Sequence, residues 1–321
     1  MAKPAIRRAS IDDAELAADL TTAAYPSEPE DPIVTRYRWE HQRDGWSVGR
    51  YIAEVEGRPV GYLWWRHGPW AQLPERHCDI GADVDQACRS DELLDHLWEW
   101  TAKQAVADGA RIIHAYAAAD ETKVLKALDH LGYERDRTDK IWQLDLEKHG
   151  RRLVQEAGTA RANMKKQGIA LVTLAEWPGQ KTLNVLHELD EAAEQDVPTS
   201  QPILPQSLEN FIDRISSPNL PHERLWIARH ADRAVAMSFL RFPPVRGNVW
   251  TGFTCSHPDY RGRGIARAVK LQSLAQAIEL GIPSVRTGND SENAAMLHIN
   301  ETLGYDPLPG YVSLVKRVSS T

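Results

Sequence analysis

The chain has 321 residues, more than one domain usually needs, so we expect two domains. Its net charge is −7, from 38 basic and 45 acidic residues, and the basic residues form no runs, which disfavours nucleic-acid binding. No apolar stretch approaches the roughly 20 residues of a membrane span, the start lacks a signal-peptide core, and the three cysteines form no disulfide or metal pattern. We therefore expect a cytoplasmic protein without membrane contact or metal.

The first half of the chain alternates predicted strands and helices. Residues 53–61 are typical of a strand, a polar turn and a second strand. A helix follows that has Leu94, Leu97, Trp98 and Thr101 at core spacing and stops at Gly109. This half closes on Leu131-Gly132-Tyr133 and a strand-like segment, 141–144.

The second half repeats this pattern. Residues 228–236 match 53–61, and Leu303-Gly304-Tyr305 matches the earlier Leu-Gly-Tyr at nearly the same offset, which indicates an internal duplication. Between the halves, residues 147–168 are rich in Lys, Arg, Glu and Ala without an apolar run. We expect a solvated linker helix there, with a disordered tether as the alternative. The predicted domains are thus 1–146 and 169–321, joined by the linker 147–168.

A glycine-rich loop is the most informative motif. Residues 260–266 read Tyr-Arg-Gly-Arg-Gly-Ile-Ala, between a β-prone stretch, 250–256, and an amphipathic helix that stops at Gly281. Glycines let the backbone approach phosphate oxygens, and the first N–H groups and the dipole of a helix attract anions. The loop lacks the Gly-Lys-Ser/Thr of a P-loop, and Arg267 stands where a dinucleotide fingerprint needs a small residue. The sequence therefore predicts a diphosphate-binding loop.

This loop and the segments after it resemble the GNAT acyltransferase superfamily. Arg-x-x-Gly-x-Ala at 261–266 is similar to its coenzyme A pyrophosphate loop, and the asparagines before Leu303-Gly304-Tyr305 are similar to its Asn-x-x-Ala…Leu-Gly-Phe segment. The resemblance implies an α/β (α+β) fold with two tandem acyl-CoA N-acyltransferase-like domains, each a bent mixed sheet flanked by helices. Tandem members with one degenerate half, mycothiol synthase among them, have this organisation.

The resemblance also implies a site in the second half. Acyl-CoA, in the simplest case acetyl-CoA, is the expected co-substrate, and its acyl group passes directly to a small-molecule amine without a metal. The residues expected to contact the co-substrate lie on a strand edge, on the loop and before the last helix: Thr254, Cys255, Ser256, Arg261, Gly262, Arg263, Gly264, Ile265, Ala266 and Asn293.

The counterpart loop in the first half, 85–92, contains no glycine. Ser90 is a natural N-cap, and Asp91 and Glu92 in the first helical turn oppose a pyrophosphate. We expect that this half does not bind the cofactor and that it supports the second half. Its aromatic residues pack in the core or line an acceptor pocket: Trp39, Trp64, Trp65 and Trp70.

The catalytic residues depart from the family pattern. Asn300 stands where the family usually has a tyrosine acid, and an amide does not titrate, so we predict that Asn300 acts by hydrogen bonding. Asp196 is the candidate contact for the acceptor amine or its base, with a turn residue as the alternative. A Cys255 nucleophile is disfavoured because direct transfer needs none.

The sequence thus predicts an N-acetyltransferase that acts on a small-molecule amine. Three alternatives stay open: a protein or peptide amine as acceptor, O-acyl transfer, and a non-catalytic acyl-CoA-binding regulator. The sequence leaves the oligomeric state open.

Overall fold

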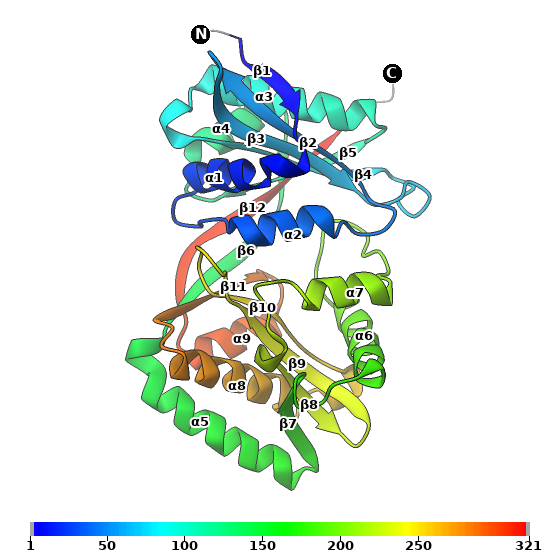
Figure 1. Cartoon of the computed structure of the whole chain (residues 1–321), viewed down its shortest axis with the longest axis vertical. Helices are drawn as coiled ribbons and strands as arrows, with labels where there is room; N and C mark the ends of the chain where they lie inside the picture. The colour runs from blue at the N-terminus through cyan, green and yellow to red at the C-terminus, as the bar shows by residue number, and fades with distance from the viewer. Residues whose placement is uncertain (1–2, 319–321) are drawn as a thin grey trace.

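The computed structural model describes residues 3–318 and shows two similar halves, one above the other (Figure 1). The strands of the first half are β1 (Ala5–Arg8), β2 (Ser47–Val55), β3 (Arg58–His67), β4 (His77–Val84), β5 (Ile112–Ala118) and β6 (Glu134–Asp145). Its helices are α1 (Ala14–Ala24), α2 (Pro32–Glu40), α3 (Asp91–Ala107) and α4 (Thr122–His130).

The second half repeats the same order of strands and helices after α5 (Leu146–Lys166). Its strands are β7 (Ile169–Thr173), β8 (Leu225–His230), β9 (Arg233–Arg241), β10 (Trp250–Ser256), β11 (Ser284–Asp290) and β12 (Asp306–Arg317). Its helices are α6 (Gln180–Glu194), α7 (Leu208–Ile215), α8 (Ile265–Glu279) and α9 (Ala294–Leu303).

The two repeats found in the sequence occupy equivalent places in the halves. Residues 53–61 form the β2–β3 turn and residues 228–236 the β8–β9 turn. Gly132 follows α4 at φ 77° and Gly304 follows α9 at φ 88°, so each Leu-Gly-Tyr ends a helix with a left-handed residue. The predicted fold class and the tandem organisation are confirmed.

The strands form one continuous sheet, because the halves exchange their last strands. The order is β1-β2-β3-β4-β5-β12-β6-β11-β10-β9-β8-β7. Strand β12 of the second half lies beside β5, whereas β6 of the first half lies beside β11, and the two strands pair with each other (Figure 1). Each half is therefore completed by a strand from the other. The boundaries at 146 and 169 stay a prediction, and a cut there would remove β6 from the sheet of the second half.

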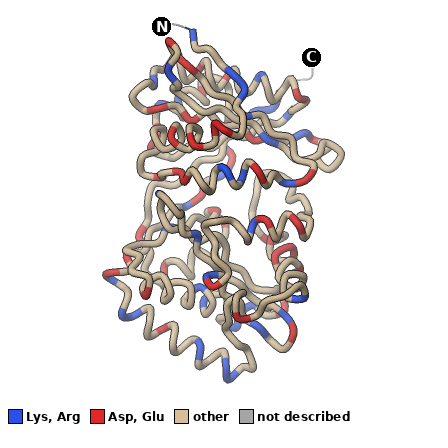
Figure 2. The backbone as a smooth tube through the Cα atoms, viewed as in Figure 1, with Lys and Arg blue, Asp and Glu red and all other residues tan. Residues whose placement is uncertain are grey.

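The expected linker is the helix α5, and it is less solvated than its composition suggests. Leu153, Ala157 and Met164 are buried, at 0%, 3% and 4% exposure, because this face of α5 packs against α8 and β7. The apolar residues of α5 recur at helical spacing and form no continuous run, so the composition of the segment alone suggests a solvated helix. Lys148, Arg151, Lys165 and Lys166 of α5 are exposed, and basic positions recur along this helix (Figure 2).

Candidate acyl-CoA site

The sheet opens between β10 and β11. These parallel strands pair only at Trp250 and Arg286, whereas β10 stays paired with β9 as far as Ser256. From Thr251 onward, the backbone groups on the other edge of β10 therefore have no strand partner. Thr254, Cys255 and Ser256, the predicted contacts, lie on this part of β10.

The glycine loop connects this strand to the N-terminus of α8. Gly262 and Gly264 have φ of 72° and 74°, a left-handed conformation that favours glycine. An added Cβ at either position would meet nothing within 4 Å, so the loop is open on its outer side. Within residues 3–318 no side chain caps α8. The N–H groups of its first turn, from Ile265 and Ala266 onward, are thus available to an anion.

The two arginines of the loop differ in their partners. Arg261 forms an ion pair with Asp196, at 2.5 Å between Nη2 and Oδ2. Arg263 has neutral partners: its Nε donates to the Gln167 side chain at 3.3 Å, and its guanidinium lies 5.2 Å from the centre of the Tyr260 ring. Among residues 3–318 no carboxylate forms an ion pair with Arg263, whereas Asp196, the predicted acceptor contact or base, lies against the glycine loop.

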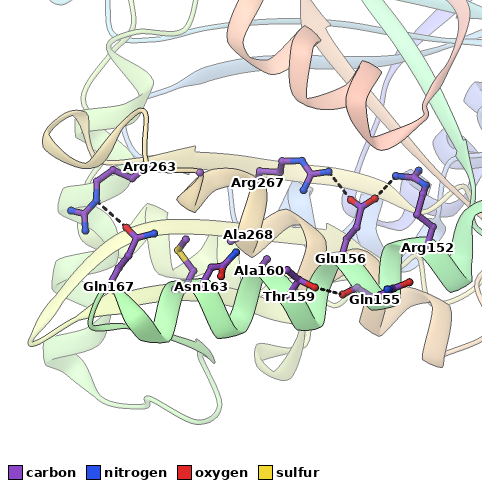
Figure 3. Close-up of a pocket in the computed structure, with 12 residues that line it drawn as sticks. Arg152, Gln155, Glu156, Thr159, Ala160, Asn163, Gln167, Arg263, Arg267 and Ala268 are labelled. Atoms are coloured by element: carbon purple, nitrogen blue, oxygen red, sulfur yellow. Dashed lines mark hydrogen bonds and ion pairs between the residues drawn. The ribbon is translucent and has the colours of Figure 1, made fainter.

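A groove of about 590 Å³ runs between α5 and α8, from Arg263 and Gln167 at one end to Arg152 at the other (Figure 3), and Gly264 is among its lining residues. Arg152 from α5 and Arg267 from α8 share the carboxylate of Glu156, at 2.8 Å and 2.6 Å. Together with Arg263, three arginines and one glutamate line the groove, which leaves it positive. Its position next to the loop gives an extended anionic ligand room beyond the helix N-terminus.

The counterpart loop of the first half is closed by its own side chains. The Ser90 hydroxyl accepts a hydrogen bond from the Leu93 N–H at 3.2 Å, and Asp91 and Glu92 lie in the first turn of α3. The positive end of the α3 dipole thus already faces two carboxylates, and the Leu93 amide already has a hydrogen-bond partner. The two loops differ in structure as their sequences predict, and the absence of a cofactor from the first half stays a prediction.

Two predicted site residues belong to α9: Asn293 caps its N-terminus, and Asn300 lies within the helix. The Asn293 side chain caps α9 by accepting from the Met296 N–H at 3.2 Å. Asn300 is 0% exposed: its Oδ1 accepts from Lys270 at 2.9 Å, and its Nδ2 donates to Asn289 at 2.7 Å. The amide of Asn300 therefore already has two partners inside the protein. A direct hydrogen bond from Asn300 to the sulfur stays a prediction.

Lys270 is a residue that the sequence reasoning missed. It lies on α8 at 0% exposure, and burial lowers the pKa of its amine to about 7. A lysine in a helix usually faces solvent, so it gave no signal. The available clue was its place in the run Ala268-Val269-Lys270-Leu271, where the neighbouring positions are all apolar.

The Cys255 side chain is buried, and a nucleophilic role stays disfavoured. It is 8% exposed and packs in the core under α6, together with Phe239 and Phe211. Burial raises the pKa of its thiol, which favours the protonated form. The neighbouring Thr254 hydroxyl is hydrogen-bonded to Ser238 at 2.8 Å.

The segment between α6 and α7, residues 195–207, connects the glycine loop to the first half. Asp196 contacts Arg261 near its start, and Gln201 donates to the carboxylate of Asp79 and, at 3.4 Å, to the Tyr116 hydroxyl. Asp79 lies where β4 and β5 part. Residues 195–207 therefore bring a side chain of the second half into contact with Asp79 and Tyr116 of the first half.

The tryptophans of the first half pack mainly within that half. Trp65 is 8% exposed and belongs to its core, and Trp70 stacks on His67 at 3.5 Å between ring centres. Trp39 lies 5.7 Å from the Tyr62 ring, and the Trp64 ring covers Gly81. Core packing thus accounts for Trp65 and Trp70, and an acceptor wall stays a prediction for Trp39 and Trp64.

Among residues 3–318, none of the helices combines the length and the apolar composition that a membrane span needs. The same residues contain no group of three or more His, Cys, Asp or Glu side chains arranged to hold a metal ion.

Residues 185–305 match the Acetyltransferase (GNAT) family. The fold is similar to a tandem GNAT protein from the clavulanic acid biosynthesis pathway, solved without AcCoA (16% identity, TM-score 0.77, 99% of this chain and 100% of that chain). It is also similar to a GCN5-related N-acetyltransferase from Sphaerobacter thermophilus (18%, 0.68, 99% and 96%) and a GNAT-family acetyltransferase from Colwellia psychrerythraea (14%, 0.60, 98% and 100%). The comparison with curated protein sequences found no match.

The family match covers the α6–α9 region, which contains the strand gap, the glycine loop and Asn289, Asn293 and Asn300. The structural similarity extends over nearly the whole chain, including the half without a glycine loop. Residues 185–305 of the second half are therefore similar to the Acetyltransferase (GNAT) family, and the chain as a whole has the fold of a tandem GNAT protein.

Proposed function

We propose that this protein transfers an acyl group, in the simplest case acetyl, from acyl-CoA to an amine of a small molecule, using its second half. The observation that carries the proposal is the uncapped N-terminus of α8, which follows two left-handed glycines beside an open strand edge. The amides of Ile265 and Ala266 and the charge of Arg263 would hold the diphosphate. The groove along α5 has room and positive charge for the nucleotide end.

The same elements support a site for the reacting end. The open edge of β10 at residues 251–256 offers backbone N–H groups that can hydrogen-bond carbonyl oxygens and align a thioester. A thioester supplies an activated acyl group whose leaving thiol has a pKa near ~8.5, so it departs at neutral pH without a strong acid. This suits a site where an asparagine stands in the place of tyrosine.

The acceptor region is proposed to lie under residues 195–207, between the halves. Small-molecule sites often lie at domain interfaces, and here Gln201 brings the second half onto Asp79 and Tyr116 of the first. Polar groups of this kind suit a small polar amine.

Release of free coenzyme A tests the proposal. Protein mixed with acetyl-CoA and a library of small amines should release thiol with at least one amine, and Gly264→Asp should abolish that release. Binding of acetyl-CoA without thiol release for any small amine or peptide would instead favour the regulator.

A further inference from the structure

Lys270 is a buried amine without a countercharge. It lies on α8 at 0% exposure, 5.0 Å from the centre of the Tyr305 ring. Its Nζ donates to Asn300, and no carboxylate in the described part of the chain pairs with it. A buried amine costs free energy that a methionine of similar length would not. Packing alone therefore does not explain an amine at this place.

The amine sets the direction of a chain of hydrogen bonds. The Nζ of Lys270 carries N–H donors both as an ammonium and as a neutral amine, and it donates to the Oδ1 of Asn300. The Nδ2 of Asn300 then lies on the other side and donates to Oδ1 of Asn289, at 2.7 Å. Asn289 must in turn direct its own Nδ2 away from Asn300. Lys270 thus determines which atom of Asn289 faces outward.

Asn289 lies at the strand gap. It is on β11, beyond the single pairing of β10 and β11 at Trp250 and Arg286, and it is only half-buried. Val285 and Thr287 lie on the same face of β11 and are buried, whereas Asn289, further along the strand, is partly exposed. The chain of hydrogen bonds that starts at Lys270 therefore reaches the protein surface at Asn289. No side chain or backbone group in residues 3–318 accepts a hydrogen bond from its Nδ2.

We propose that Lys270 is a positioning residue for acyl-CoA. It orients Asn300 and, through Asn300, Asn289, so that the N–H groups of Asn289 face the gap and donate to a carbonyl oxygen of the bound acyl-CoA. The inference rests on the proposed function and gives Asn300 a different role from direct contact with the sulfur. It assigns the contact with the ligand to Asn289.

A double-mutant cycle tests the coupling. The affinity for acetyl-CoA is measured by titration calorimetry for the wild type, Lys270→Met, Asn289→Ala and the double variant. Each single substitution should weaken binding roughly three- to tenfold, as expected for one lost hydrogen bond. The double variant should bind as weakly as Asn289→Ala alone, because Lys270 acts only through Asn289. Additive effects, or no effect of Lys270→Met, would overturn the inference.

Asn300→Asp provides a second test that preserves packing. A carboxylate only accepts, so it keeps the bond to Lys270 and draws the Nδ2 of Asn289 inward. The donors then leave the gap, and the affinity should fall as in Asn289→Ala. An unchanged affinity would contradict the proposal.

Gln272→Met is the matched control, since Gln272 is a buried polar residue of the same helix that donates to Ala157 on α5. Its affinity for acetyl-CoA should match that of the wild type. A loss equal to that of Lys270→Met would assign the effect to general damage to α8 and overturn the inference. A wild type that does not bind acetyl-CoA at all would instead refute the proposed function, and this inference with it.

Discussion

Two glycines determine how α8 begins. Gly262 and Gly264 take left-handed conformations, and the space around both is open, so the backbone amides face solvent. At Gly264, an aspartate would add strain, bulk and a negative charge where the helix dipole attracts anions.

Gly264→Asp is therefore expected to weaken acetyl-CoA binding at least roughly tenfold, about 1.4 kcal/mol. Gly281→Asp is the matched control, because Gly281 has φ 73° and open space at the opposite end of α8. Titration calorimetry of both variants checks this. Equal losses in the two variants would show that strain, and not the anion site, is responsible.

The buried Lys270 makes stability depend on pH. Burial lowers its pKa from 10.5 to about 7 in the folded protein. Between these values the unfolded chain binds more protons than the folded one, so a rise in pH favours folding. Below about pH 7 both states are protonated, and the full cost of burying the charge is present.

The stability of the wild type relative to Lys270→Met is accordingly expected to rise between pH 7 and 10, with a slope of up to about 1.4 kcal/mol per pH unit. Urea unfolding of both proteins at pH 7, 8 and 9 measures the difference, in which other titrating groups cancel. Parallel stability curves would show that Lys270 has an ordinary pKa.

Local sequence signals were enough to predict the residues whose role depends on their own backbone. Gly264, Gly304 and Ser90 have conformations or caps that follow from residue type and spacing. Lys270 and Asn289 could not be found in this way, because the burial of a lysine depends on how α8, α9 and β11 pack together. The sequence predicts Asp196 as a contact for the acceptor amine or as its base, and it does not predict the ion pair with Arg261 that the structure shows.

At the scale of elements, residues 195–207 link the two proposed substrate regions. The Asp196–Arg261 ion pair is about half-exposed on both sides, so it contributes about 0.2–1 kcal/mol. A diphosphate and the Asp196 carboxylate would compete for the same guanidinium.

Asp196→Asn distinguishes the two roles of this residue. If the carboxylate restrains Arg261, its loss should lower KM for acetyl-CoA roughly two- to fivefold at low salt and leave kcat unchanged. Steady-state kinetics at two salt concentrations checks this. A large fall in kcat with KM unchanged would instead identify Asp196 as the base for the acceptor amine.

At the scale of the whole molecule, the exchange of β6 and β12 joins the halves into one sheet. The internal repeat predicted two similar halves, and they are present. The local sequence does not predict the exchange, because each of the two strands follows a Leu-Gly-Tyr segment and only long-range pairing decides which half each one completes.

A fragment of residues 165–321 is expected to be poorly soluble, since it lacks β6 and exposes the edges of β11 and β12. A fragment of residues 134–321 restores β6 and α5 and should be more soluble, although β12 still lacks β5. Gel filtration and circular dichroism compare the two. If the shorter fragment were soluble and transferred acyl groups at the full-length rate, the first half would have no part in the function.

The central claim is that one chain has one acyl-CoA site, at the glycine loop of the second half. Titration calorimetry of the full chain with acetyl-CoA tests it most directly, with Gly264→Asp and Ser90→Gly measured in parallel. The account predicts one site per chain, lost in Gly264→Asp and retained in Ser90→Gly. Two equivalent sites per chain, or a single site that Gly264→Asp leaves intact, would contradict it.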